Sequence, residues 1–148
     1  PGTGDVQLTL VQSVPLSGAV MVTTPQEVAL VDAVRAMNMF RMQQIDVSIL
    51  GVIENMSWFT PAELPDNKYY IFGEGGGQRL AKSSHSELIG QVPLIMGIRE
   101  NADKGTPNTG DDYPEINRVF ENIAENLILQ LNKIATTKGK SKVVRVQS

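Results

Sequence analysis

The fold is decided by the stretch Gly51-Val52-Ile53-Glu54-Asn55-Met56-Ser57-Trp58-Phe59, in which an apolar run ends in polar residues and an aromatic pair. Residues 47–53 are rich in β-branched side chains and nearly free of polar ones, which is typical of a strand covered on both faces in a parallel sheet. Ligands of open α/β sheets bind beyond the carboxyl ends of such strands. Asn55 therefore stands where its amide could contact a ligand, or where a turn residue simply closes the strand.

A strand and a helix precede this stretch. Residues 19–23 form a compact apolar strand, and Thr24-Pro25-Gln26-Glu27 follows it as a helix start, with Thr24 as N-cap, Pro25 as the first helical residue and Glu27 completing a capping box. The helix is expected to run to about Met42, since its apolar residues recur at the spacing of one buried stripe. Residues 43–46 return the chain to the strand of residues 47–53 through a right-handed crossover.

The segments after this stretch complete the predicted fold. Residues 60–70 contain two prolines and form a long irregular excursion, a kind of loop that often carries function. Gly73-Glu74-Gly75-Gly76-Gly77 opens a helix over residues 78–84, and its spacing favours a hinge or helix entry over a phosphate cradle. A third strand over residues 91–95, a loop over residues 99–112 and a last helix capped by Asp112 follow. The pattern predicts an α/β fold of three layers, a mostly parallel sheet with flanking helices.

The composition limits the class of protein. The 148 residues, 41% hydrophobic and 20% charged, are typical of a globular chain, and residues 1–135 are predicted to be one domain. Without cysteine there is no disulfide and no thiolate for zinc or an iron–sulfur cluster. His85, the single histidine, has no carboxylate or second histidine nearby, and no metal site is predicted. No apolar run approaches the roughly 18 residues of a membrane span and no signal peptide is present, which predicts a cytoplasmic protein without membrane contact.

The charge is uneven along the chain. Residues 136–148 carry four basic side chains and no acid, so removing their +4 from the net charge of −3 leaves −7 for residues 1–135. An acidic globular part predicts no nucleic-acid binding. The last thirteen residues are expected to be a basic flexible tail.

Five motifs occur in order: Pro1-Gly2-Thr3-Gly4-Asp5-Val6-Gln7-Leu8-Thr9, Thr23-Thr24-Pro25-Gln26, the stretch from Gly51 to Phe59, Phe72-Gly73-Glu74-Gly75-Gly76-Gly77, and Gly90-Gln91-Val92-Pro93-Leu94. Together they resemble the Mrp (ApbC-type) ATPases, relatives of MinD and of the nitrogenase iron protein, over Pro1 to about Ile134. The resemblance implies the second half of a deviant-Walker P-loop NTPase fold. It also implies an ATPase that carries iron–sulfur clusters to apoproteins or scaffold proteins, as a homodimer with nucleotide at the interface.

The resemblance implies six nucleotide-binding residues: Gly2, Gly4, Asp5, Asn55, Pro93 and Leu94. Gly2 is expected to be the switch II glycine that senses the γ-phosphate, with Gly4 and Asp5 in the same segment. Asn55 matches an asparagine that hydrogen-bonds adenine, and residues 93–94 would line the base from the next strand end.

The chain departs from the family pattern in two places. The phosphate loop, its lysines and the acid that work with ATP and Mg²⁺ belong to a preceding half that these residues do not include, so no catalytic residue and no hydrolysis by this piece alone are predicted. Many members also carry Cys-x-x-Cys after the Trp-Phe pair. Here residues 60–67 contain no sulfur, and Glu63 and Asp66 are hard oxygen donors that would not replace thiolates.

Two other functions remain open. The chain could be a non-catalytic interaction module that binds a protein through Trp58, Phe59, Tyr69 and Tyr70, or a MinD-like ATPase switch without a cluster. A structural expectation also follows from the missing half: the strand of residues 20–23 would have an unpaired apolar edge. Self-association is predicted through that edge or through surfaces that the missing half would cover.

Overall fold

The computed structural model describes residues 5–43, 45–106 and 114–138. Helices and strands alternate through most of this part of the chain. In order they are α1 (Asp5–Ser13), β1 (Ala19–Thr23), α2 (Glu27–Phe40), β2 (Ile49–Asn55), α3 (Gly76–Ser83), β3 (Leu88–Val92), α4 (Met96–Lys104) and α5 (Pro114–Lys138).

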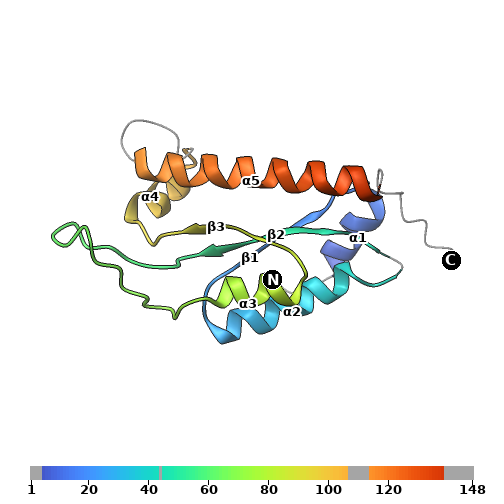
Figure 1. Ribbon diagram of the computed structural model, residues 1–148, viewed down its shortest axis with the longest axis horizontal. Coiled ribbons are helices and arrows are strands. Elements are labelled where there is room, and N and C mark those ends of the chain that lie inside the picture. Colours follow the sequence, from blue (N-terminus) through green and yellow to red (C-terminus); the bar gives the residue numbers. More distant parts are fainter. Residues whose placement is uncertain (1–4, 44, 107–113, 139–148) are drawn as a thin grey trace.

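The described strands form one parallel sheet in the order β1-β2-β3. Helices α2 and α3 cover one face of the sheet and α5 runs along the other, so the protein has three layers (Figure 1). The predicted α/β fold is confirmed. None of the described helices is both long and apolar enough to cross a membrane.

The main core fills the space between the sheet and the α2–α3 layer. Its fully buried members are Met21, Leu30, Ala33, Met37, Val52, Leu80 and Ala81. On the other face, Ile116 and Ile123 of α5 are buried. Gly90 admits α5 closely, since a Cβ added there would lie 2.2 Å from Cγ1 of Ile123, well inside normal van der Waals contact.

Helix α2 begins later than the sequence predicted. Gln26, with φ −64° and ψ 138°, is the N-cap, and the helix runs from Glu27 to Phe40 instead of reaching Met42. Thr24 Oγ1 donates to Gln26 Oε1 at 3.2 Å and makes no capping bond to the helix backbone. Pro25 stays outside the helix because its backbone packs against Gly76, whose added Cβ would lie only 2.5 Å from the Pro25 carbonyl oxygen.

The strand boundaries also differ from the predicted ones. Strand β2 spans Ile49–Asn55 where residues 47–53 were expected, and β3 spans Leu88–Val92 where residues 91–95 were expected. Val47 precedes the first residue of β2 and is buried in a cluster with Val11, Met39 and Ile45. Its apolar side chain therefore reflects packing in this cluster and not membership of the strand.

Helix α4 replaces most of the loop predicted over residues 99–112. It ends at Gly105, which has a φ of 66° and serves as a left-handed C-cap. Gly97 is its one buried residue. The sequence therefore contained no apolar stripe from which this helix could be predicted. Asp112, the predicted cap of the last helix, lies outside the described residues, whereas α5 itself is present from Pro114 onward.

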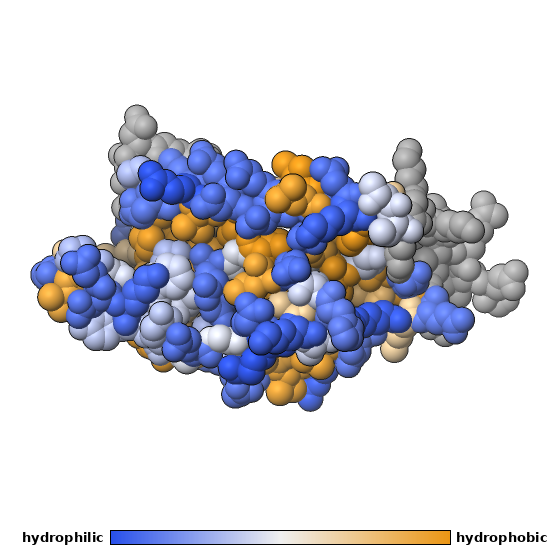
Figure 2. Space-filling view, viewed as in Figure 1, coloured by the Kyte–Doolittle hydropathy of each residue, from blue (hydrophilic) through white to orange (hydrophobic). Residues whose placement is uncertain are grey.

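Strand β1 is an edge strand among the described residues, as the sequence predicted, because it pairs with β2 alone. Val22 of this strand is 60% exposed. Figure 2 shows apolar residues in a band between α5 along the top and the α2–α3 layer below.

Candidate functional site

The carboxyl ends of β2 and β3 are held together beyond the last pair of the ladder. Asn55 is the last residue of β2 and pairs with Val92. Past the strands, the Ser57 N–H donates to the Val92 carbonyl at 3.0 Å, and the Leu94 N–H donates to the Trp58 carbonyl at 2.7 Å. The two strand ends therefore leave the sheet side by side, at the edge where open α/β sheets bind ligands.

Asn55 is half-buried and its amide has a fixed orientation. The Oδ1 atom accepts the N–H of Met56 at 3.0 Å. Met56 has a φ of 54°, a left-handed conformation that is costly for a residue with a side chain. Oδ1 keeps a second lone pair, and Nδ2 carries two donors. Beside it, Pro93 and Leu94 are also half-buried and provide apolar surface.

Glu54 holds this edge from the opposite face of the sheet. Its side chain is 1% exposed. Oε2 accepts the N–H of Gly77 at 2.6 Å, and Oε1 accepts Nε2 of Gln91 at 2.8 Å. Its carbonyl accepts the hydroxyl of Ser57 at 2.8 Å. Sequence reasoning missed this residue because its side-chain partners lie 23 and 37 residues away, and the only signal was an acid inside an apolar run.

The glycine-rich segment is a close-packed helix entry, one of the two interpretations that the sequence favoured. Gly75 is the left-handed N-cap of α3, with a φ of 72°. Gly76 and Gly77 follow, and both are buried. A Cβ at Gly77 would lie 2.7 Å from Cβ of Glu54. The glycines thus let the first turn of α3 lie directly against the ends of β1 and β2.

The structure gathers three of the six nucleotide-binding residues expected from the sequence: Asn55, Pro93 and Leu94. Gly2 and Gly4 lie outside the described residues. Asp5 is the first residue of α1. That helix packs through Val11 at the amino end of β2, opposite to the end that carries Asn55 (Figure 1). Of the expected switch II residues, Asp5 is therefore placed away from Asn55.

The excursion after β2 is irregular, as predicted, but it is closed at its base. Phe59 and Tyr69 form an antiparallel bridge, with N–H···O distances of 2.9 and 2.8 Å. Lys68 Nζ lies 4.0 Å from the ring centroid of Trp58. Phe59, Tyr69 and Tyr70 are between 38% and 45% exposed, so three of the four aromatic side chains considered as a binding surface do face solvent.

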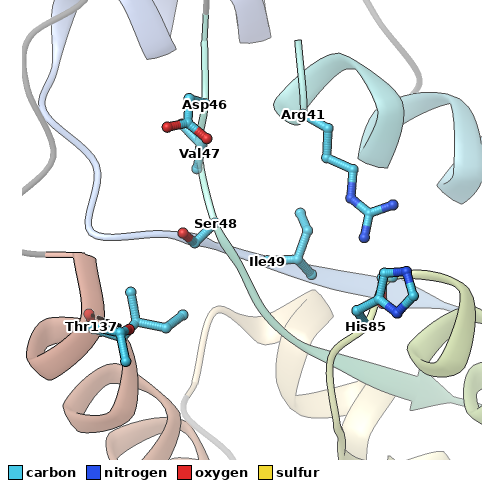
Figure 3. Close-up of a pocket in the computed structure, with 9 residues that line it drawn as sticks. Arg41, Asp46, Val47, Ser48, Ile49, His85 and Thr137 are labelled. Carbon is cyan, nitrogen blue, oxygen red and sulfur yellow. Dashed lines mark hydrogen bonds between the residues drawn. The ribbon is translucent and has the colours of Figure 1, made fainter. Parts of the chain in front are cut away.

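A hollow of about 430 Å³ lies at the amino end of β2, away from the strand ends described above. Arg41 reaches from the end of α2 toward His85, and Thr137 of α5 lies on the other side (Figure 3). Asp46 and His85 have φ values of 42° and 47°. The walls of the hollow come from four separate segments of the chain, so no sequence motif indicated this hollow. Within the described residues, no group of three or more His, Cys, Asp or Glu side chains is placed to hold a metal ion.

The family model described as ParA, NUBPL iron-transfer P-loop NTPase, matches residues 1–128. The chain belongs to this family. The resemblance to the Mrp-type ATPases is thereby confirmed, and the matched residues include both strand ends of the candidate site.

Relatives of this iron-transfer NTPase family member share sequence well beyond the site. The chain is 57% identical over 107 residues to an iron-sulfur cluster carrier protein of Synechocystis sp., covering 72% of this chain and 30% of the relative. It is 42% identical over 142 residues to the iron-sulfur cluster transfer protein NUBPL of Dictyostelium discoideum, covering 95% of this chain and 43% of the relative. The chain thus spans less than half the length of these relatives.

One solved structure similar to this family member is a nucleotide-binding protein from Archaeoglobus fulgidus in complex with ADP. Its TM-score to this chain is 0.60 at 35% sequence identity, and the match covers 71% of this chain and 42% of that protein. The α/β architecture described above is therefore that of a nucleotide-binding P-loop protein.

Proposed function

We propose that the carboxyl ends of β2 and β3 form the adenine-contacting wall of an ATP site. An asparagine amide matches the N6 amine and N7 atom of adenine, with Oδ1 accepting from the amine and Nδ2 donating to N7. Guanine carries an acceptor, O6, in place of the amine. The bond from the Met56 N–H to Asn55 Oδ1 holds the amide in one orientation, which supports adenine over guanine as the preferred base.

Residues 93–94 complete this wall from β3. Pro93 and Leu94 are half-buried and offer apolar surface to the flat face of a base, whereas Asn55 supplies the polar contact. Small-molecule sites are commonly built in this way, with few polar groups on an apolar lining. The single observation that carries the proposal is the fixed amide of Asn55 at a paired strand end, in a chain similar to a protein solved with ADP.

The wider function that we propose is ATP-dependent handling of iron–sulfur clusters by the full-length protein. Support comes from family membership and from relatives named as cluster carriers or transfer proteins. In this proposal a phosphate loop and Mg²⁺ perform hydrolysis together with the switch II residues Gly2, Gly4 and Asp5. The protein would act as a cytoplasmic homodimer that delivers clusters to apoproteins or scaffold proteins. The 148 residues by themselves are proposed to be inactive.

The cluster itself has no fitting ligands in this chain. Iron–sulfur clusters are held by cysteine thiolates, and the full sequence contains no cysteine. Residues 60–67, where thiolates occur in many members, offer only oxygen donors. A cluster carried as cargo would therefore need ligands from outside these residues, and the alternative of an ATPase switch without a cluster rests on the same observation.

The excursion supports a second proposed role, contact with a partner protein. Phe59, Tyr69 and Tyr70 present exposed aromatic surface on a closed loop, and aromatic side chains are frequent anchors of protein interfaces. This role is compatible with the ATP site, because the excursion of residues 60–70 follows Asn55 closely in the chain without including it.

Titration of the full-length protein with fluorescent ATP and GTP analogues tests the adenine wall. Asn55→Ala is expected to reduce the preference for ATP over GTP by about 1–3 kcal/mol, roughly 5- to 150-fold in the ratio of dissociation constants. Asn67→Ala, at an exposed position in the excursion, serves as the control and should bind both nucleotides as the wild type does. Unchanged affinity and unchanged base preference in Asn55→Ala would sink the proposal.

A further inference from the structure

Glu54 lies at the centre of a row that crosses the sheet at its carboxyl end. In the ladder it pairs with Thr23 of β1 on one side and with Gln91 of β3 on the other. Its carboxylate bonds to Gln91 and to the first turn of α3, and its carbonyl bonds to Ser57 in the segment that follows Asn55. One residue thus joins β2, β3, α3 and the segment between β2 and the excursion.

The chemistry of the carboxylate makes these contacts selective. An ionised carboxylate only accepts hydrogen bonds, so each of its oxygens needs a donor when it is buried. The donors to Glu54 are the Gly77 N–H and the Gln91 amide. Both come from other elements, and the Gly77 N–H lies at a helix amino terminus, which favours a negative charge. Shifting α3 would break a buried charge-assisted bond, and shifting the end of β3 would break a part-buried one.

Asn55 and the apolar part of the proposed base wall are the immediate neighbours of these contacts. Asn55 directly follows Glu54, and Pro93 follows Gln91 by two residues. Side chains alternate along a strand, so Glu54 faces α3 while Asn55 faces the opposite side. A hydrogen bond weakens steeply when its length or angle departs from the normal range, so recognition of a base by Asn55 depends on the spacing of the two strand ends.

We propose that Glu54 is a positioning residue for base recognition. Its carboxylate fixes the spacing between Asn55 and residues 93–94, and through that spacing it sets the preference for adenine over guanine. This inference rests on the proposed ATP site. It adds a residue that does not touch the nucleotide and that acts through Gln91 and Gly77.

Exchanging the side chains of Glu54 and Gln91 tests the proposal in the full-length protein. Gln91→Glu places a second carboxylate against Glu54 and removes the donor. Glu54→Gln keeps the shape of the side chain and can keep both bonds, because Gln91 can turn its amide and accept from the new Nε2. In the double variant Glu54→Gln/Gln91→Glu, the donor and the acceptor have exchanged places. Gln78→Glu, an exposed glutamine in the first turn of α3, is the matched control for the added charge.

The readouts are the dissociation constants for fluorescent ATP and GTP analogues and for inorganic triphosphate as a competitor without a base. Gln91→Glu should lower the ATP-over-GTP ratio by roughly fivefold or more and leave triphosphate binding unchanged. The double variant and Glu54→Gln should keep a ratio close to that of the wild type. Circular dichroism checks that each variant is folded, which is expected because Gln91 is exposed.

The outcomes separate this inference from the proposed function. If the wild type shows no ATP preference, or if Asn55→Ala leaves that preference intact, the adenine wall itself is wrong and the role of Glu54 falls with it. If Asn55→Ala abolishes the preference but Gln91→Glu does not, the wall stands and the positioning role is refuted. Equal weakening of ATP, GTP and triphosphate binding in Gln91→Glu, without rescue in the double variant, would also refute it, since Glu54 would then only stabilise the fold.

Discussion

Replacing Gly77 by alanine is expected to destabilise the protein, although alanine favours helices over glycine by about 1 kcal/mol. The new Cβ would lie 2.7 Å from Cβ of Glu54, 3.1 Å from Cδ1 of Leu88 and 3.2 Å from Oε2 of Glu54. The first contact cannot be relieved by a side-chain rotation, because Cβ moves only with the backbone of β2. The first turn of α3 must therefore retreat from the sheet.

The size of the effect follows from two losses. Overpacking in a well-packed place costs about 1–3 kcal/mol. The retreat also stretches the 2.6 Å bond from the Gly77 N–H to the buried carboxylate, and a hydrogen bond to a charged group contributes about 1.5–3 kcal/mol. After the helix-propensity gain, a net loss of about 1.5–5 kcal/mol remains, which lowers the melting temperature of a chain of this size by roughly 3–20 °C.

Urea unfolding of the purified protein, followed by circular dichroism, measures this loss as a shift of the midpoint at constant slope. Gln78→Ala is the control, because the next residue of α3 is exposed and its replacement should change stability by less than about 0.5 kcal/mol. A Gly77→Ala protein as stable as the wild type, or more stable, would show that α3 does not lie as close to Glu54 as described and would refute the reasoning.

Two further changes test other parts of the structure. Lys68→Ala should shift the fluorescence emission of Trp58, the single tryptophan, to longer wavelength, because Lys68 Nζ lies 4.0 Å from the ring centroid and covers the ring. Lys82→Ala is the control. An unchanged emission spectrum in Lys68→Ala would contradict the contact. Val22→Lys should reduce any self-association of the protein seen by light scattering, since lysine protects exposed strand edges. Val28→Lys, on the exposed side of α2, should not, and a wild type that is monomeric at high concentration would contradict the predicted association.

Elements whose burial follows a local pattern could be predicted from the sequence. The apolar runs around Met21 and Val52 indicated β1 and β2, and the stripe that contains Ile116 and Ile123 indicated α5. The third strand was predicted three residues too late, over residues 91–95. Helix α4 could not be predicted in this way, because Gly97 is its one buried residue and it has no apolar stripe. The start of α2 was misplaced for a related reason: Pro25 has good helix-start chemistry, but its contact with α3 holds it outside the helix.

The candidate site shows the same division. Asn55 could be named as a candidate because a polar residue at the end of an apolar strand is visible in the sequence, and its predicted nucleotide role came from the family resemblance. The contacts of Glu54 could not be predicted, since its donors are brought together only by the packing of α3 on β2 and the pairing of β2 with β3. The glycine-rich motif at the start of α3 was visible in the sequence. The reason for two of its glycines was not, because Gly76 packs against Pro25 and Gly77 against Glu54, both far away in the chain.

The bridge between Phe59 and Tyr69 has a consequence for how such proteins can diversify. Because it closes the excursion at its base, insertions, deletions or exchanged metal ligands between these two residues need not alter the strands below, and longer surface loops add little entropic cost. A metal-binding loop and a loop without thiolates can then be interchanged on one unaltered frame. Grafting such a loop between Phe59 and Tyr69 should therefore leave the sheet and its helices unchanged.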